Sequence, residues 1–384
     1  MDARPSSERI SAWTIGREWG RIGCVGFGGP PAHIALLRKL CVEKRRWLGH
    51  EEFEDAIAAC NLLPGPASTQ LAIFTAWRIG GPLGGLLGGA AFILPGLIVI
   101  VALAAVFFAG SSPDWIRGAE AGAGAGVAAV AVHAGASLIP GSRARATSHW
   151  RWSAYIVAGT VTSALLGPWV VLVLLGCGLV EATLRVRPNG LAAMAAPLAV
   201  ALPTTGGLGA LAWVALKVGG LSYGGGFVII PLMQHDAVSA YHWMTNAEFL
   251  NAVALGQITP GPVTLTVAVV GYGAAGIGGA LLATAVAFAP SFAFILGGAT
   301  HFDALRTNPF AQNFFAGAGP AAIGAIFGAA IPLARALSEG WQFVLLALAA
   351  ALLLVARRSP LVTLLTLALI GVVAALAGAS LPTQ

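Results

Sequence analysis

The chain has 384 residues, of which 57% are hydrophobic and 9% are charged, with a formal net charge of +6. So little charge cannot cover the surface of a soluble protein of this size, which excludes a soluble fold and predicts an integral membrane protein. Apolar runs of 18 or more residues recur along the chain, whereas strands of a membrane barrel are about 10 residues of alternating polarity. We therefore predict an all-α polytopic membrane protein with about 10 to 12 spans.

The first segment is charged rather than apolar. Residues 8–22 mix tryptophan with arginine and glutamate, which is typical of a helix at the membrane interface and not of a cleavable secretory signal. A glycine-rich turn follows at 26–31, and Pro31 suits the first turn of a new helix. We expect this half-helix to run to about Leu40, with His33 in its first turn.

The next apolar stretch, about 54–77, contains a Pro-Gly-Pro sequence at 64–66 near its middle. Because proline removes a backbone donor and clashes with the preceding turn, the span should be broken there. With a rise of about 1.5 Å per residue, the break lies near the bilayer midplane. Further spans are expected at 83–108 and 119–139, followed over 152–183 by a hairpin of two short helices.

The pattern restarts after a linker at 188–206. A shift of 196 positions, which places Pro64-Gly65-Pro66 on Pro260-Gly261-Pro262, aligns 22–92 with the second half without a gap. The same shift superposes Phe27, Gly28 and Gly29 on Tyr223, Gly224 and Gly225, Trp47 on Trp243, and Glu52-Phe53 on Glu248-Phe249. Chance similarity between Ala- and Gly-rich stretches would not keep these residues in register, so we predict two homologous domains, 1–190 and 205–384, of about five to six helices each.

The two repeats differ in charge. The loop at 38–46 holds five Lys or Arg residues, and its counterpart at 234–242 holds none. Opposite charge bias in equivalent loops indicates opposite insertion, and so an inverted repeat. The arginines of the remaining loops do not all fall on one side of the membrane in a simple count of spans, so the sequence leaves the orientation of each repeat open.

Each break predicts an anion site. A helix that restarts at Pro66 leaves its first N–H groups without partners in the membrane interior, at the positive end of the helix dipole. Together with the glycine turns, as many as four half-helix starts converge between the repeats and suit a small tetrahedral oxyanion. The substrate-binding candidates are Arg21, Gly28, Gly29, His33, Asn61, Pro64, Gly65, Pro66, Ser68, Thr69, Gln70, Lys217, Gly224, Gly225, Gln257, Pro260, Gly261, Pro262 and Thr264.

Several candidates have a structural alternative. Arg21 and Lys217 are equivalent, and each either supplies positive charge to the site or extends to a membrane surface. His33 either binds a proton or the anion, or has a structural role only. Three acids are candidates for proton coupling, although the helix dipole alone favours an acid at a helix start. They are Glu52, Asp55 and Glu248.

The sequence does not contain the residue patterns of a metal site, a nucleotide-binding site or a covalent catalyst. The four cysteines form no CxxC pair, and no two histidines have metal-ligand spacing with acids nearby. No Walker loop, dinucleotide fingerprint or nucleophile elbow occurs in context. We expect no metal, no cofactor, no nucleic acid and no enzyme activity. The expected partners are the oxyanion and the lipid bilayer, and a homodimer is left open.

Three motifs carry a resemblance to a known family: Phe27-Gly28-Gly29-Pro30-Pro31-Ala32-His33-Ile34, Val42-Glu43-Lys44-Arg45-Arg46-Trp47-Leu48 and Asn61-Leu62-Leu63-Pro64-Gly65-Pro66-Ala67-Ser68-Thr69-Gln70. With their counterparts in the second half, they resemble the chromate ion transporter family over about 13–300. The resemblance implies a multi-pass protein of the inner (cytoplasmic) membrane that exports chromate, driven by the proton motive force, with sulfate as a close analogue.

The chain departs from that family pattern at two positions. Asn61 stands where the family has a glutamine, and Phe227 stands where a polar residue is common. Both bear on which oxyanion fits. The alternatives are therefore a transporter of sulfate or another small anion and, from a different class, a membrane-embedded enzyme or scaffold.

Overall fold

The computed structural model describes residues 10–61, 63–109, 113–185, 206–222, 227–298 and 308–382, without the side chains of Pro168 and Phe227. These ranges are helical and contain no strand, as the composition predicted. Helices are the form in which a chain in lipid satisfies its own backbone donors and acceptors. The predicted linker at 188–206 lies outside the described residues except for Gly206.

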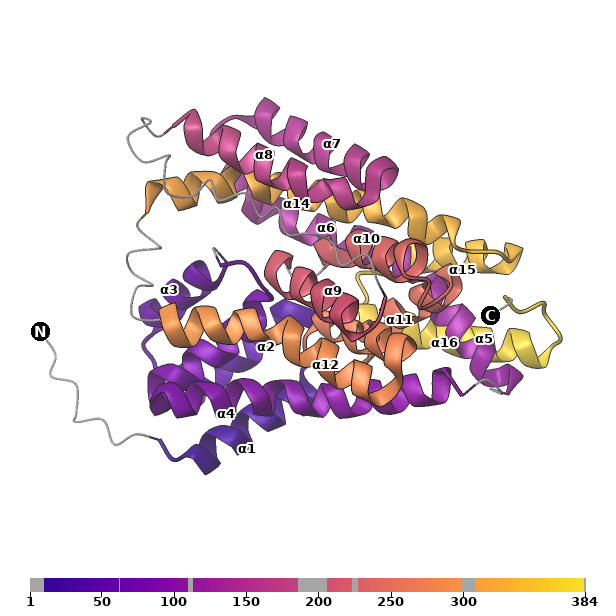
Figure 1. Cartoon of the computed structure of the whole chain (residues 1–384), viewed down its shortest axis with the longest axis horizontal. Coiled ribbons are helices and arrows are strands. Elements are labelled where there is room, and N and C mark those ends of the chain that lie inside the picture. The colour runs from indigo at the N-terminus through magenta and orange to yellow at the C-terminus, as the bar shows by residue number, and fades with distance from the viewer. Residues whose placement is uncertain are drawn as a thin grey trace, which may run out of the picture.

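The two halves are built from helical segments in a related order (Figure 1). The first half consists of α1 (Ala12–Val25), α2 (Gly29–Arg38), η1 (Lys39–Lys44), α3 (His50–Cys60), α4 (Ala67–Phe107), α5 (Asp114–Ala125), α6 (Val127–Ala144), α7 (His149–Leu166), η2 (Gly167–Trp169) and α8 (Val170–Thr183). The second half consists of α9 (Leu208–Leu221), η4 (Phe227–Ile229), α10 (Ile230–Gln234), η5 (His235–Ala240), α11 (Asn246–Ile258), η6 (Val263–Leu265), α12 (Thr266–Gly298), α14 (Pro309–Arg335), α15 (Gly340–Ala350), η8 (Ala351–Val355) and α16 (Pro360–Leu376).

The element boundaries follow the shift found in the sequence. The π-helical turns η1 and η5 end at Lys44 and Ala240, and α3 and α11 begin at His50 and Asn246. Both pairs are 196 positions apart. The two halves are therefore structural repeats, and the Pro-Gly-Pro breaks lie between α3 and α4 and between α11 and η6.

The long helices α4 and α12 each fold back on themselves. Gly81 in α4 has φ 69° and Gly276 in α12 has φ 61°, conformations that interrupt a helix. The segments on either side then pack closely, because a Cβ added to Gly84 would lie 2.7 Å from the carbonyl oxygen of Ala76. In each of these helices, the segment between the break and the kink therefore packs against the longer segment that follows the kink.

Equivalent helices of the two repeats run in opposite directions. Gly85 of α4 lies against Leu296 of α12, and Gly89 lies against Phe292, so residue numbers rise along one helix as they fall along the other. The same relation holds for α6 and α14, because residues 128–132 line one cavity with 327–335, and residues 137–145 line another with 315–323. This is the arrangement of an inverted repeat.

The two repeats exchange their C-terminal hairpins. The α7–α8 hairpin packs on α14 of the second repeat, and the α15–α16 hairpin packs on α5 and α6 of the first (Figure 1). Glycines allow these close approaches, since a Cβ on Gly159 would lie 2.0 Å from the carbonyl oxygen of Ala321, and one on Gly118 would lie 2.4 Å from that of Gly371. The repeats therefore form one interlocked unit.

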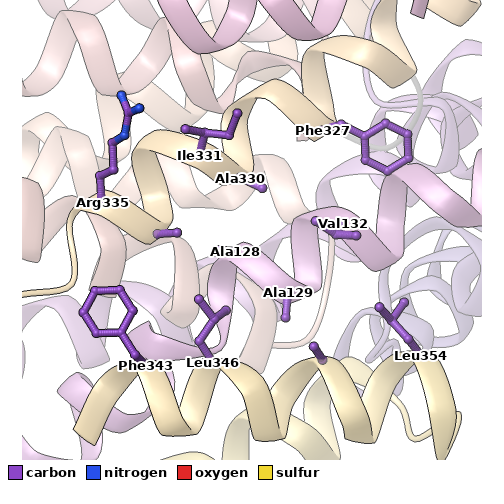
Figure 2. A pocket seen from close by; sticks show the side chains of 12 residues that line it. Ala128, Ala129, Val132, Phe327, Ala330, Ile331, Arg335, Phe343, Leu346 and Leu354 are labelled. Carbon is purple, nitrogen blue, oxygen red and sulfur yellow. The ribbon is translucent and has the colours of Figure 1, made fainter. Parts of the chain in front are cut away.

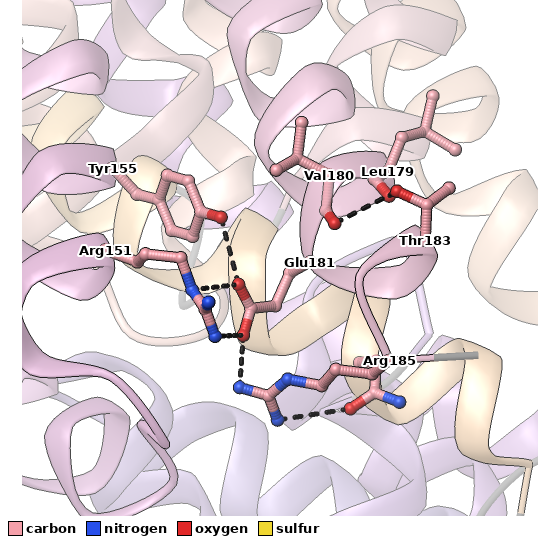
Figure 3. A network of polar contacts seen from close by, with 8 residues as sticks. Arg151, Tyr155, Leu179, Val180, Glu181, Thr183 and Arg185 are labelled. Carbon is pink, nitrogen blue, oxygen red and sulfur yellow. Dashed lines mark hydrogen bonds and ion pairs between the residues drawn. The ribbon is translucent and has the colours of Figure 1, made fainter. Parts of the chain in front are cut away.

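A polar cluster fixes the first hairpin to α14 (Figure 3). The buried carboxylate of Glu181 accepts a hydrogen bond of 2.9 Å from the hydroxyl of Tyr155 and pairs with Arg151 at 3.1 Å and with Arg185. Arg185 also donates to the side-chain oxygen of Asn313 at 3.3 Å. A buried carboxylate needs this degree of pairing, so the cluster has a structural explanation.

Four helical segments of the described chain are long and apolar enough to cross a membrane: Ala67–Phe107, Asp114–Ala144, Val263–Gly298 and Pro309–Arg335. Four further apolar helices are shorter: Val170–Thr183, Leu208–Leu221, Gly340–Val355 and Pro360–Leu376. The predicted number of 10 to 12 spans is reached only when half-helices and short hairpin helices are counted. At about 1.5 Å per residue, a helix of 14 residues covers roughly 21 Å of an apolar layer of about 30 Å.

Candidate functional site

The first break is a buried turn flanked by polar side chains. After α3 ends, Gly65 adopts φ 126°, and Pro66 precedes the first residue of α4. Ser68, Thr69 and Gln70, in the first turn of α4, are 0 to 1% exposed. Gln70 donates from Nε2 to the carbonyl oxygen of Pro64 at 2.7 Å and so closes the turn over itself.

The second break repeats this arrangement. Gly261 adopts φ 101° between α11 and η6. Gln257 in the last turn of α11 and Thr264 in η6 are buried, with 8% and 1% of their surface exposed. Two buried turns, each followed by a helix start, thus lie in the interior of a membrane protein, as the sequence predicted.

Backbone hydrogen bonds tie each break to the other repeat. The N–H of Gly65 donates to the carbonyl oxygen of Ser222 at 2.8 Å, and the N–H of Gly261 donates to that of Gly26 at 2.9 Å. Gly26 and Ser222 occupy equivalent positions just before the two glycine turns. Each break is therefore bonded to the residue that directly precedes the glycine turn of the other repeat.

His33 holds the first glycine turn and the first break together. Its side chain is fully buried, with Nε2 2.9 Å from the carbonyl oxygen of Gly26 and Nδ1 3.2 Å from the hydroxyl of Ser68. A carbonyl only accepts, so Nε2 carries a proton; in the neutral ring Nδ1 accepts from Ser68. The edge of the ring packs against Phe92, with 5.0 Å between the ring centroids. His33 thus lies between the elements that form the site.

The long segments of α4 and α12 cover the breaks. A Cβ on Gly96 would lie 2.2 Å from the carbonyl oxygen of Pro260, so α4 approaches the second break at backbone distance. A Cβ on Gly65 would lie 2.9 Å from the hydroxyl of Ser291 on α12. Each break is therefore enclosed by a helix of the opposite repeat.

Polar atoms without partners gather at these breaks. Six buried side-chain atoms of this region have no hydrogen-bond partner among the described residues. They are Thr69 Oγ1, Gln70 Oε1, Ser222 Oγ, Gln257 Nε2, Thr264 Oγ1 and Ser291 Oγ. Leaving a polar group buried and unpaired costs about 1–3 kcal/mol. Hydroxyl and amide donors with this spare capacity could bind a small polar ligand.

The remaining sequence candidates are exposed, have protein partners, form a glycine turn or fall outside the described residues. Arg21 is exposed, whereas Lys217 pairs with the buried Asp236 at 2.5 Å, so the charge of Lys217 is balanced within the protein. Gly28 and Gly29 have positive φ, 99° and 71°, at the start of α2. Gly224 and Gly225 fall outside the described residues.

The three acidic candidates differ in their surroundings. Glu52 pairs with Arg78 at 2.5 Å, and both side chains are about one-third exposed. Glu248 accepts from the N–H of Thr245 at 2.6 Å and completes a capping box at the start of α11. Asp55 is exposed on α3, one turn closer to the break. No group of His, Cys, Asp or Glu in the described part of the chain could hold a metal ion.

Four residues of the site were not among the sequence candidates: Gly26, Gly96, Ser222 and Ser291. Gly26 and Ser222 could have been found, because they directly precede the two aromatic-Gly-Gly turns. Gly96 and Ser291 each follow a proline inside a long apolar span, which carries no signal for a contact with a distant break.

A larger, apolar cavity lies elsewhere. It is a groove of about 720 Å³ between α6, α14 and α15, with Val132, Phe327, Phe343 and Leu354 among its apolar lining (Figure 2). Apart from Arg335 at one end, its side chains cannot donate hydrogen bonds. The groove therefore suits hydrocarbon rather than a small polar ligand.

Comparison with known proteins places these features in context. The sequence profile of the chromate transporter family matches residues 13–182 and 209–376. The chromate transport protein of Cupriavidus metallidurans is 32% identical over 326 residues, which cover 82% of this chain and 80% of the relative. The probable chromate transport protein of Synechococcus elongatus is 30% identical over 82% of both chains. An uncharacterized transporter of Methanocaldococcus jannaschii is 25% identical over 79% of both. No solved structure shows a significant match.

Proposed function

The chain belongs to the chromate transporter family, and from this premise we propose that it is a secondary transporter that exports chromate across the inner (cytoplasmic) membrane. The described helices make it a multi-pass membrane protein, and its named relatives are transporters rather than enzymes. Alternating access between two inverted repeats is a common mechanism for such proteins. The proposed domains are 1–190 and 205–384.

The oxyanion binds at the two breaks. The observation that carries this proposal is the set of buried, unpartnered side-chain atoms gathered where the breaks of both repeats meet. Thr69 and Thr264 offer hydroxyl donors, and Gln257 offers an amide donor. A tetrahedral oxyanion has enough acceptor oxygens to use several of these donors at once.

Electrostatics at the breaks favours an anion. The first turns of α4 and of η6 with α12 direct backbone N–H groups toward the breaks, and a helix N-terminus carries about half a positive charge. A dianion needs more compensation than this. We assign the remaining positive charge to Arg21 and Lys217, with Lys217 exchanging Asp236 for the substrate.

The proton motive force drives export in this proposal. Of the three acidic candidates, we assign the coupling to Asp55, which lies about one turn closer to the first break than Glu52 does. Asp55 lies on the helix that leads directly into the first break. Its protonation would change the charge beside the oxyanion path.

Flux measurements in proteoliposomes test this function. Purified protein under an imposed pH gradient should transport chromate, and the rate should collapse when the gradient is dissipated. The Pro64→Ala and Pro260→Ala variants should insert normally and lose flux, because the loss of one proline reshapes the turn that leaves the N–H groups of the next helix free. Chromate flux equal to that of empty liposomes would contradict the proposal, and intact flux in both proline variants would remove the breaks from the mechanism.

Sulfate is the second candidate substrate. Hydroxyl and amide donors recognise any tetrahedral dianion of similar size, and the donors at the breaks are of this kind. Competition decides between the two ions. If chromate is the physiological substrate, unlabelled sulfate should inhibit chromate flux only at a large excess, whereas inhibition at equal concentration would identify a less selective oxyanion transporter.

A further inference from the structure

We propose that a polar cavity beside the first break is an entry site for the oxyanion, where Arg145 draws the ion toward Asn61 and the break. The cavity has a volume of about 240 Å³ and lies between the C-terminal half of α6 and the middle of α14. Asn61, which caps the C-terminus of α3 just before the break, forms part of its wall. The identity of the ion rests on the proposed function.

The cavity contains uncommitted donors. No hydrogen bond or ion pair within the described residues engages the guanidinium of Arg145 or the carboxamide of Asn61. Seven of the thirteen other described arginines have such a partner, as Arg38 does in Glu54. Ser142 accepts a hydrogen bond of 3.0 Å from the indole N–H of Trp152, so its own hydroxyl proton is available to a ligand.

The charge balance of the cavity favours anions. Among the described residues that line it, Arg145 is charged and no carboxylate is present. Phe315, Leu138 and Ile323 provide apolar walls, which strengthen the field of a nearby charge. A guanidinium in this setting raises the local concentration of a dianion next to the break, and it can bind two of its oxygens together.

This role makes a specific kinetic prediction for chromate flux in proteoliposomes. Arg145→Gln should raise KM about three- to tenfold while Vmax changes by less than about twofold, and high ionic strength should reduce the difference because salt screens an exposed charge. Arg145→Lys keeps the charge and should restore most of the affinity. Arg143→Gln is the matched control, since Arg143 is exposed on the same helix end but does not line the cavity.

Equal kinetics in Arg145→Gln and Arg143→Gln would overturn the entry site while leaving the proposed function intact. A fall in Vmax without a change in KM would overturn it as well, because it would place Arg145 in the conformational cycle. Absence of chromate flux in the wild-type protein would instead reject the proposed function, and a measurement that needs no transport then decides on the cavity.

That measurement uses a cysteine as a local probe of potential. Ser137 lines the cavity and is exposed, and among the native cysteines Cys24 is exposed while the other three are buried. In a Ser137→Cys, Cys24→Ser protein, the rate at which a negatively charged, sulfonate-bearing methanethiosulfonate modifies the cysteine is divided by the rate for a neutral methanethiosulfonate. Arg145→Gln should lower this ratio about three- to tenfold, and Arg143→Gln should not. An unchanged ratio, or an equal fall in both variants, would reject the anion-attracting cavity.

Discussion

The backbone N–H of Gly65 donates to the carbonyl oxygen of Ser222, which belongs to the other repeat, at 2.8 Å. Gly261 and Gly26 form the equivalent bond at 2.9 Å. Each break is therefore held partly by the backbone of the other repeat. A movement of one repeat against the other must break or shift these bonds, which couples the shape of the site to the arrangement of the repeats.

Replacing the central glycines should impair transport to different degrees. Both have positive φ, where alanine costs about 1–2 kcal/mol. A Cβ at Gly65 would also lie 2.5 Å from Gln70 Nε2, whereas at Gly261 the nearest atom is 3.3 Å away, on Leu265. We expect Gly65→Ala to lower the initial chromate rate by more than about tenfold and Gly261→Ala by about two- to fivefold, at equal incorporated protein. The reverse order would show that crowding at Gln70 is unimportant.

Removing an unpartnered hydroxyl should weaken binding without harming the fold. Thr264→Val breaks no hydrogen bond of the described protein, so the melting temperature in detergent should stay equal or rise. If the oxyanion accepts from Thr264, KM for chromate should rise about tenfold, which corresponds to about 1.4 kcal/mol.

Thr284→Val is the matched control for that substitution. Thr284 is also buried, but its hydroxyl donates to the carbonyl oxygen of Ala280 at 2.8 Å, within its own helix. We expect a slightly lower melting temperature and an unchanged KM. A similar KM in both threonine variants would show that Thr264 does not contact the substrate.

The His33–Ser68 contact should be measurable as a coupling energy. Ser68→Ala and His33→Ala each remove the hydrogen bond between them, and His33→Ala also leaves a cavity beside Phe92. In a double-mutant cycle of thermal stability, the double variant should be less destabilised than the sum of the single ones, by about 0.5–1.5 kcal/mol. Strict additivity would mean that the 3.2 Å contact contributes nothing.

Proton coupling should respond to Asp55 and not to Glu248. Glutamine can occupy the same position of a capping box, so Glu248→Gln preserves the start of α11 while removing a charge. We expect Glu248→Gln to keep the dependence of flux on the imposed pH gradient and Asp55→Asn to lose it. A loss in Glu248→Gln with normal thermal stability would assign the coupling to Glu248 instead.

The sequence was most informative where a local signal had one physical explanation. Pro-Gly-Pro inside an apolar span permits no continuous helix, and its repetition at a fixed shift predicted both breaks and both repeats. The same reasoning could have reached the cap of α11, because Thr245 stands three residues before Glu248 in the capping-box spacing. This spacing indicates a cap at Glu248, which is also one of the candidates for proton coupling.

Contacts between elements distant in the sequence could not be read in the same way. Lys217 and Arg21 are equivalent in the alignment, but Lys217 pairs with Asp236, and the residue equivalent to Asp236 is Leu40. Nothing in the spacing indicates this partner, because the turn of η5 and the packing of α9 bring it there. The unpaired state of the hydroxyls at the breaks likewise depends on every neighbouring side chain.

The fold should be most sensitive to substitution where two helices approach each other closely at a glycine. In Gly159→Ala the new methyl group would lie 2.0 Å from the carbonyl oxygen of Ala321, so α7 must move away from α14, at a cost of about 1–3 kcal/mol or more. Gly176 on α8 is the control, since a Cβ there meets nothing within 4 Å. We expect Gly159→Ala to lower the melting temperature in detergent by several degrees and Gly176→Ala to leave it equal or higher, since alanine favours a helix. Because the α7–α8 hairpin packs on the other repeat, equal melting temperatures in both variants would mean that the hairpin exchange contributes little to stability.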